Sequence, residues 1–281
     1  MTTPVRTRWG RLGSFGLGVW AVLGFVFLFT PIVVSVLFSF NEPEGKYNYI
    51  WNHFSLDAWT NPFEYEDLTD SLRYSLTIAV IVTIIATIIG TLMGLAMVKY
   101  RFRAKGLLST ILILPLTMPE IVMGFSLLSL FVAMDVSRNM WTIVIAQVVF
   151  SISYVATTVR ARIRGFDWRL EEAALDLGAS PIRTFTKVTL PLILPGVVAA
   201  ALLTFALSLD DFIITYLNSG LDNTFPIQIW NMKRSKIPVQ INVFSTALLV
   251  ISILVALMLV VANNRRAHRL PTALRQDRIG R

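Results

Sequence analysis

The sequence predicts an all-α integral membrane protein with six transmembrane helices. Of the 281 residues, 55% are hydrophobic and only 15% are charged, and the mean hydropathy is +0.65. This balance is typical of membrane proteins rather than of soluble domains. Apolar runs long enough to cross a bilayer, which takes roughly 20 residues, occur at about 12–40, 74–98, 106–133, 139–159, 189–216 and 243–262. Because no linker or fixed-period repeat separates them, residues 1–281 are expected to form a single transmembrane domain.

The first run is predicted to be a retained span rather than a cleaved signal peptide. No charged residue lies between Arg11 and Glu42, and this stretch is too long for a signal-peptide core. No convincing A-x-A cleavage site follows it. We therefore count it as the first transmembrane helix.

The distribution of Lys and Arg predicts that both ends of the chain face the cytoplasm. With the N-terminus inside, nineteen of the 25 basic residues fall in cytoplasmic segments, which are the N-terminus, "KYRFRAK" at 99–105, residues 160–188 and the C-terminal tail. Such an excess sets the orientation of multi-span proteins. The clusters lie beside apolar runs, so membrane orientation explains the net charge of +8 better than nucleic-acid binding does.

The first external segment, 41–73, is rich in acidic and aromatic residues. It carries seven acids, Glu42, Glu44, Asp57, Glu64, Glu66, Asp67 and Asp70, interleaved with Tyr47, Tyr49, Trp51 and Trp59. Aromatic residues near a membrane interface commonly act as anchors. Contact with a partner or ligand is the alternative.

The second run carries a face of small residues. Gly90 and Gly94 stand four positions apart, accompanied by Thr83, Thr87 and Thr91. This pattern lets two transmembrane helices approach closely. We expect a packing role for this face.

The longest internal cytoplasmic segment interrupts the apolar runs with two predicted short helices. Asp167 is a plausible N-cap and Gly178 a C-terminal stop, so the first helix is expected at about 168–177. Ser180 is expected to cap the second helix, with Pro181 at its first position. A sharp turn between them would form a helical hairpin.

The first of these helices is amphipathic. Its apolar residues recur at i, i+3, i+4 and i+7 and are Leu170, Ala173, Ala174 and Leu177. In the second helix Ile182, Phe185 and Val188 continue an apolar stripe. Such a hairpin can lie flat on the membrane, or it can project as a low-relief docking surface for a cytoplasmic partner. The pattern leaves both interpretations open.

Three carboxylates lie inside predicted spans that contain no basic residue. Glu120 follows Pro115 and Pro119 in the third run, and Asp210 and Asp211 lie in the fifth. A carboxylate at the bilayer centre costs roughly 2.5–3.5 kcal/mol, so such groups normally face a cavity, a partner or a pathway. The alternative is that they lie near the outer interface and reach water there.

In the fifth run, polar residues recur at helical spacing. Thr204, Ser208, Asp211 and Thr215 stand at i, i+4, i+7 and i+11, which makes one polar stripe on a continuous helix. Asp210 would point about 100° away from it. The stripe favours Asp211 as the residue that faces a cation pathway with acidic walls.

The cytoplasmic hairpin also carries a family resemblance. "EAALDLG", nine further residues and then Val188-Thr189-Leu190-Pro191 resemble the EAA loop (E-A-A-x3-G-x9-I-x-L-P) of permease subunits of binding-protein-dependent ABC importers. Only the Ile position departs, as Val188. The resemblance implies the type I ABC importer permease architecture and a loop, 160–188, that sits in a cleft of an ATP-binding subunit. It places Glu172, Ala173, Ala174 and Gly178 at the coupling interface.

No motif for nucleotide, cofactor or metal binding is present in the sequence. The chain has no G-x-x-x-x-G-K-[ST] and no other glycine-rich phosphate loop before a helix. ATP and Mg²⁺ are therefore expected on a separate ATPase chain, although a secondary transporter would lack the motif too. There is no cysteine, and His53 and His268 lie far apart, so metal chemistry has little support.

A second resemblance covers residues 203–249 and indicates the substrate class. "LSLDDFIITYLNSG", "TFPIQIW" and "IPVQINVFSTALL" are similar to the spermidine/putrescine group of this permease family. Polyamines carry spaced ammonium groups, for which carboxylates and aromatic faces are suitable partners. The residues expected along the substrate pathway are Glu120, Ser208, Asp210 and Asp211. Neither argument chooses putrescine over spermidine.

These features predict a non-enzymatic, multi-pass permease of the bacterial cytoplasmic (inner) membrane that imports polyamines. Its expected partners are an ATP-binding subunit, a second permease subunit, an external substrate-binding protein and membrane lipid. The alternatives are a permease for another solute and an ion-coupled secondary transporter that uses the acids as a proton relay. An intramembrane aspartyl protease is disfavoured because G-x-G-D is absent and adjacent Asp side chains on a helix diverge.

Overall fold

The computed structural model describes residues 8–268, with side chains for 16–258 and for Val261. Most of the basic C-terminal tail that contributes to the predicted orientation lies outside these residues. The chain divides into two compact units, residues 1–65 with 233–281 and residues 66–232. The single-domain organisation expected for the whole chain stays a prediction.

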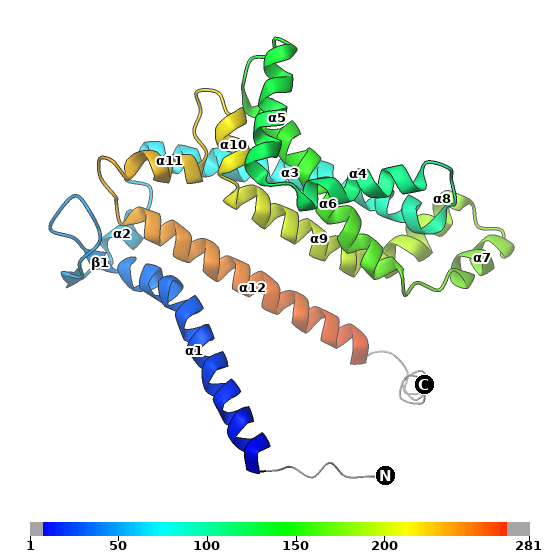
Figure 1. Cartoon of the computed structure of the whole chain (residues 1–281), viewed down its shortest axis with the longest axis horizontal. Helices are drawn as coiled ribbons and strands as arrows, with labels where there is room; N and C mark the ends of the chain where they lie inside the picture. Colours follow the sequence, from blue (N-terminus) through cyan, green and yellow to red (C-terminus); the bar gives the residue numbers. More distant parts are fainter. Residues whose placement is uncertain (1–7, 269–281) are drawn as a thin grey trace. The chain divides into compact units, whose positions relative to one another are not determined.

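The first unit contains two long helices and a small two-stranded sheet. Its elements are α1 (Arg8–Phe38), β1 (Asn41–Glu42), β2 (His53–Phe54), α2 (Asp57–Thr60) and α12 (Gln240–His268). β1 and β2 pair antiparallel, and α1 and α2 both contact α12 (Figure 1). Within the two long helices, Gly16–Phe38 and Gln240–Met258 are apolar enough to cross a membrane.

The second unit is a helical bundle whose core is formed by α3, α6 and α9. Its elements are α3 (Glu66–Lys99), α4 (Lys105–Thr117), α5 (Glu120–Ala133), α6 (Met140–Ile163), α7 (Arg169–Asp176), α8 (Pro181–Thr184), the π-helical turn η1 (Phe185–Thr189), α9 (Leu190–Asp210), α10 (Ile213–Asn218) and α11 (Phe225–Met232). The three core helices pack against one another (Figure 1). They bury aliphatic side chains such as Ala86, Val159 and Ile193.

The small-residue face of α3 packs closely against α6. A Cβ atom added at Gly90 would lie 2.6 Å from Cβ of Val155, and one at Gly94 would lie 3.0 Å from the carbonyl oxygen of Ala156. Only glycine permits the two helix backbones to approach this closely. The packing role predicted for this face is confirmed.

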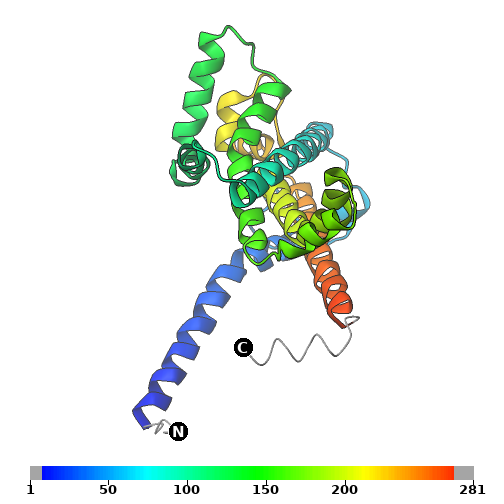
Figure 2. The same cartoon turned by 90° about the vertical axis from the view of Figure 1, so that its right-hand side faces the viewer.

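The third predicted run, 106–133, is divided by a sharp bend. Residues Lys105–Thr117 and Glu120–Ala133 form two helices bent by 112°, and together they count as one broken candidate span (Figures 1 and 2). The cause is Pro119, which cannot donate a helical hydrogen bond and which forces the preceding Met118 into an extended conformation with ψ of 140°. Within the described residues, five further helices are long and apolar enough to cross.

The fifth predicted run, 189–216, begins and ends elsewhere. One candidate span of 30 residues covers Pro181–Asp210, so the second helix of the cytoplasmic hairpin is continuous with the span. Pro191 has no N–H for the preceding turn, and the helix widens into η1, where the N–H of Leu190 bonds to the carbonyl oxygen of Phe185.

The predicted apolar stripe of the second hairpin helix is only partly covered by the second unit. Ile182 is 78% exposed, whereas Phe185 packs against the core. The two residues therefore do not share one buried face.

Candidate functional site

The hairpin of α7 and α8 begins and ends at the predicted capping residues. The Asp167 carboxylate accepts a hydrogen bond from the N–H of Arg169 at 3.1 Å, where α7 begins. Gly178 has a φ of +84°, the left-handed conformation that ends a helix. The Ser180 hydroxyl accepts from the N–H of Arg183 at 3.4 Å, with Pro181 at the first position of α8. The two helices and their turn are confirmed.

The residues expected at the coupling interface lie on an accessible part of this hairpin. Glu172, Ala173 and Gly178 are exposed, and Ala174 is half-buried. The apolar side chains of α7 are also uncovered, because Leu177 is 89% exposed. The second unit therefore leaves the apolar stripe free for another surface.

A charged residue fastens α7 to the second unit, and sequence reasoning missed it. Glu171 is only 8% exposed, and its carboxylate forms an ion pair with Lys99, the last residue of α3. The Lys99 ammonium also lies 5.8 Å from the ring centroid of Trp168 and 5.6 Å from that of Tyr100. The sequence pattern does not distinguish Glu171 from Glu172, because both carboxylates suit the first turn of a helix.

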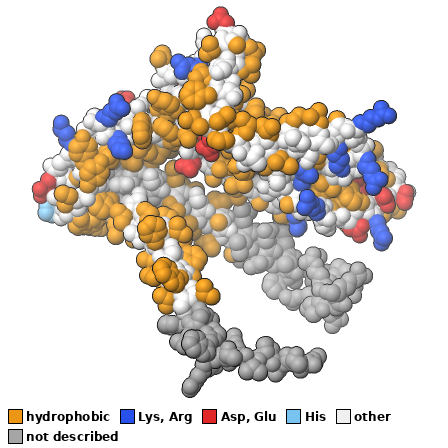
Figure 3. All heavy atoms as spheres, in the orientation of Figure 1, with side chains coloured by type: hydrophobic (Ala, Val, Ile, Leu, Met, Phe, Trp, Pro, Cys, Tyr) orange, Lys and Arg blue, Asp and Glu red, His pale blue; other side chains and the backbone are white. Residues whose placement is uncertain are grey.

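Basic side chains gather around this end of the second unit (Figure 3). The exposed members are Arg101, Arg103, Arg162, Arg164, Arg169, Arg183 and Lys187. They come from the loop before α4, from the end of α6 and from the segment that carries α7, α8 and η1. The predicted cytoplasmic segments 99–105 and 160–188 thus lie at one end of the bundle.

The two carboxylates Glu120 and Asp211 lie near each other at helix breaks. Glu120 is exposed and begins α5, directly after the break at Pro119. Asp211 lies in the break between α9 and α10. Gly124 of α5 packs against Ile214 of α10, which holds the two breaks together. The structure thus brings together acids that are distant in the sequence.

Asp211 caps α10 rather than standing in a continuous helix. It is extended, with φ of −65° and ψ of 120°, and its Oδ2 accepts hydrogen bonds from the N–H of Thr215 at 2.8 Å and from the Thr215 hydroxyl. Gln147 Nε2 donates to the same oxygen at 3.3 Å. The predicted straight stripe is therefore wrong in geometry, because this cap stabilises a new helix after the break.

Three of the four members of the stripe nevertheless meet around Gln147 of α6, whereas the buried Thr204 hydroxyl has no hydrogen-bond partner among the described residues. The Ser208 hydroxyl donates to Gln147 Oε1, and Gln147 Nε2 donates to the Thr215 hydroxyl at 2.8 Å. All three side chains are buried. Gln147 is a lone amide in an apolar run, a signal that sequence reasoning passed over.

Asp210 differs from Asp211 in its exposure and in its hydrogen bonds, the two properties that decide whether a carboxylate is available to a ligand. It ends α9 and is exposed, whereas Asp211 is held by Thr215 and Gln147. Among the described residues, no Lys or Arg forms an ion pair with Glu120, Asp210 or Asp211. No described cation pairs with their negative charges.

A second acidic region lines a cavity of about 510 Å³ at the opposite end of α3 from Lys99. Asp67, Asp70 and Tyr74 contribute from α3, and Asp222 and Gln228 from the segment around α11. Asp67 and Asp70 belong to the acidic segment noted in the sequence. Asp222 was missed because it lies in a short polar loop about 150 residues further along the chain.

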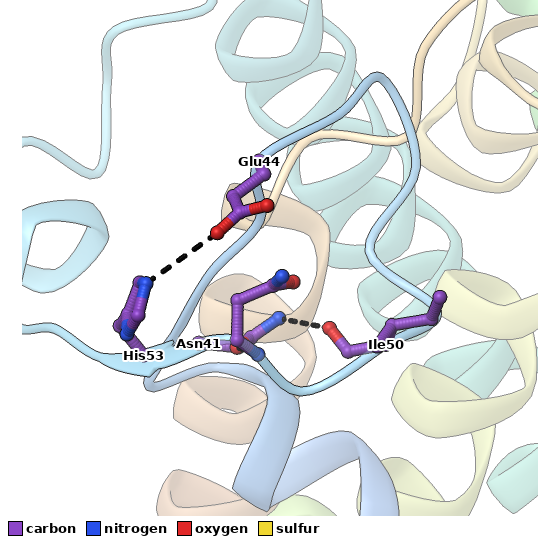
Figure 4. Close-up of polar contacts among 5 residues, drawn as sticks. Asn41, Glu44, Ile50 and His53 are labelled. Atoms are coloured by element: carbon purple, nitrogen blue, oxygen red, sulfur yellow. Dashed lines mark hydrogen bonds and ion pairs between the residues drawn. The ribbon is translucent and has the colours of Figure 1, made fainter.

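The acidic and aromatic segment of the first unit folds into an ordered loop (Figure 4). Asn41 Nδ2 donates to the carbonyl oxygen of Ile50 at 2.8 Å, and His53 lies 3.5 Å from the Glu44 carboxylate. Trp59 stacks on Phe40 with ring centroids 5.5 Å apart. Some of its aromatic residues therefore stabilise the loop itself, in addition to any role at a membrane interface.

Comparison with known proteins identifies the family. Residues 86–269 match the family described as "Binding-protein-dependent transport system inner membrane component". The chain belongs to this family. Its matched residues include the α7–α8 hairpin, both helix breaks and the whole of α12, so the family match covers the segments of the candidate site.

Curated relatives extend the similarity to nearly the whole chain. The spermidine/putrescine transport system permease protein PotC of Haemophilus influenzae is 34% identical over 245 residues, covering 87% of this chain and 95% of the relative. The putrescine transport system permease protein PotI of Escherichia coli is 33% identical over 236 residues, covering 81% and 83%. These are transport permeases, and the function expected for this chain is of the same kind.

Solved structures confirm the fold of a type I ABC importer permease. A bacterial ABC transporter involved in the import of the acidic polysaccharide alginate has a TM-score of 0.64 at 14% identity, covering 92% of this chain and 96% of that chain. An amino acid ABC transporter has a TM-score of 0.56 at 17% identity, covering 75% and 100%. At these identities the likeness concerns the fold alone.

Proposed function

We propose that this chain is the permease subunit of an ATP-driven importer that carries polyamines such as putrescine and spermidine across the cytoplasmic membrane. The observation that carries the substrate class is the 34% identity with a spermidine/putrescine permease over 87% of the chain. The carboxylates of the second unit that pair with no described cation are chemically suited to ammonium groups. A permease for an anionic solute would not gain from them.

The helix breaks form the proposed substrate pathway. Broken helices commonly mark substrate sites near the bilayer midplane of transporters. α4 and α9 both end at these breaks, and the C-terminal end of a helix carries partial negative charge that favours a cation. Glu120 and Asp210 add exposed carboxylates at the same places.

The four predicted pathway residues divide into two roles. Glu120 and Asp210 are exposed and unpaired, so they are assigned to contact with the substrate. Ser208 and Asp211 are bound to Gln147 and Thr215, so they hold the break in place. The Asp211 charge still contributes to the negative field along the route.

The α7–α8 hairpin is the proposed docking surface for an ATPase subunit that binds ATP and Mg²⁺. Small side chains leave a surface of low relief at Ala173, Ala174 and Gly178, beside the exposed Glu172. The neighbouring leucines are exposed to solvent. An apolar patch rimmed by charged groups is typical of a protein interface. The basic residues around it favour the cytoplasmic side of the membrane.

Contacts within each unit support the predicted membrane topology. Lys99 pairs with Glu171, and both segments are predicted to be cytoplasmic. In the first unit the N–H of Ile237 donates to the carbonyl oxygen of Lys46 at 2.9 Å, and both are predicted to be external. A second permease subunit and an external substrate-binding protein complete the proposed importer in the inner membrane.

The test is uptake of labelled putrescine and spermidine by cells that express the transporter genes with and without this chain. We expect uptake of at least one amine to require the chain and to be restored by a plasmid copy. Uptake of an unrelated amino acid serves as the control for membrane energisation. Equal amine uptake in both strains, with the remaining subunits present, would refute the proposed substrate class.

A further inference from the structure

We infer that the Lys99–Glu171 ion pair is the positioning contact that carries movement of α7 into α3. The inference rests on the proposed role of α7 in docking an ATPase. It adds a second route into the bundle, besides the covalent route through α8, η1 and α9. Neither Lys99 nor Glu171 belongs to the predicted coupling residues.

The ion pair is a buried attachment of α7 to the end of α3. Glu171 is the buried residue of this helix, and its side chain is 11% exposed, against 34% for that of Lys99. Burial reduces screening by water and salt, so the attraction is stronger than that of a surface pair. The second carboxylate oxygen, Oε2, is buried without a hydrogen-bond partner, so the Glu171 charge depends on Lys99 for compensation.

The surroundings of Lys99 restrict its ammonium group to this position. The rings of Trp168 and Tyr100 lie within 6 Å of it, which is the range of a cation–π interaction. Trp168 packs edge-on against Phe166 with centroids 4.7 Å apart, and both rings contact the core cluster. Trp168, the residue just before α7, is thus also held at the end of α3, in addition to Glu171.

The two routes into the bundle differ in stiffness. The route through α9 contains the π-turn η1 and two prolines, Pro191 and Pro195, and such sites are where helices bend. α3 is an unbroken helix of 34 residues without proline. A displacement of its terminal Lys99 is therefore transmitted along the helix with less bending.

The far end of α3 carries features that such a displacement would reach. The Ser75 hydroxyl accepts a hydrogen bond from the N–H of Phe225 at 2.7 Å, which ties α11 to α3. Asp67, Asp70 and Tyr74 line the acidic cavity there. One rigid helix thus connects the proposed ATPase-docking end with an acidic cavity at the other end of the unit.

The test uses the absence of cysteine from this chain. A Lys99→Cys/Glu171→Cys variant is assembled with cysteine-free partner subunits and reconstituted in proteoliposomes. Putrescine uptake and ATP hydrolysis are measured before and after treatment with a short bifunctional thiol reagent. Lys99→Arg retains the charge, and Arg103→Met removes an exposed cation from the loop before α4, outside the pair, so both serve as controls.

We expect the double-cysteine variant to take up at least about fivefold less putrescine per ATP hydrolysed, and cross-linking to restore most of the wild-type ratio. Lys99→Arg and Arg103→Met should both stay within about twofold of wild type. A merely structural loss would lower assembly and hydrolysis together, and cross-linking would not repair the ratio. A wild-type ratio without the cross-link, or loss of transport with it, would overturn the inference.

A parallel measurement separates this inference from the proposed function. A photoreactive residue at Leu177, next to Gly178, reports whether α7 touches the ATPase subunit in the assembled complex. If it labels the ATPase while the pair variants remain fully coupled, only the ion-pair inference fails. If it labels no ATPase, the docking role of α7 fails and the inference is overturned with it.

Discussion

Neighbouring aspartates show how strongly local structure decides the role of a side chain. Asp210 and Asp211 are identical in chemistry and adjacent in the chain, yet one is exposed at the end of α9 and the other caps α10. The cap satisfies a backbone N–H and the Thr215 hydroxyl while receiving an N–H from Gln147. Stability and transport should therefore respond differently to the two positions.

Replacing Asp211 with Ala should destabilise the protein by about 1–2 kcal/mol, because the cap of α10 and its bond to Gln147 are lost. The measurement is the midpoint of thermal unfolding of the purified complex. Asp210→Ala is the matched control and should shift stability by no more than about 0.5 kcal/mol, as expected at an exposed site. Equal destabilisation by both changes would contradict the assigned roles.

For transport the order should be reversed. Asp210→Asn keeps the shape of the side chain but removes a charge that faces the proposed route, so we expect several-fold lower uptake of putrescine at a normal amount of folded protein. Glu120→Gln should act in the same direction. Uptake per folded molecule is the readout, and wild-type uptake in both variants would remove these carboxylates from the pathway.

The close packing of α3 against α6 can be tested by a substitution at Gly90. A methyl group at Gly90 would lie 2.6 Å from the Cβ of Val155 and 3.0 Å from the carbonyl oxygen of Ile152, so α3 and α6 must separate to admit it. Gly90→Ala should cost about 1–3 kcal/mol by overpacking. Gly106→Ala is the control, since nothing lies within 4 Å of its added atom. A stable Gly90→Ala variant would contradict the close packing of these helices.

The exposed hairpin is the second element with a direct test. Glu172→Arg reverses a charge on the proposed docking surface, and Gly178→Asp places a side chain at a φ of +84°, which strains the turn. Both should uncouple ATP hydrolysis from uptake while leaving membrane insertion intact. Hydrolysis and uptake are measured on the same proteoliposomes, and normal coupling in both variants would exclude the hairpin as the coupling element.

The sequence predicted correctly those features that depend on residues close together in the chain. The caps of the hairpin, the packing of Gly90 and Gly94, and the apolar runs all follow from nearby residues. The breaks were harder to predict, because long apolar segments continue on both sides of Pro119 and of Asp211. The capping role of Asp211 depends on Gln147, 64 residues away, and the burial of Glu171 depends on Lys99, 72 residues away.

The acids too were predictable only as far as nearby residues determine their properties. Sequence spacing identified Glu120, Asp210 and Asp211 as unusual, because carboxylates are costly in a membrane. It could not separate the aspartate that faces a ligand from the one that supports the backbone. That difference arises only when α9 ends at Asp210 and a new helix begins.

At the scale of the whole molecule, the second unit combines the features that a transport subunit needs. A hairpin with an uncovered apolar surface lies at one end. Carboxylates that form no ion pair with any described Lys or Arg lie at breaks between helices. α3 and α9 connect these regions through packed helical contacts. This arrangement can convert a push on α7 into a change at the helix breaks.

The central claim is that this chain forms the polyamine route of an ATP-driven importer. The most direct measurement is putrescine and spermidine uptake into proteoliposomes that contain the complete complex, compared with the same preparation lacking only this chain. The account predicts uptake that requires the chain and ATP, and that persists when an uncoupler abolishes the proton gradient. Uptake by this chain alone, indifferent to ATP and abolished by the uncoupler, would contradict it and indicate an ion-coupled carrier.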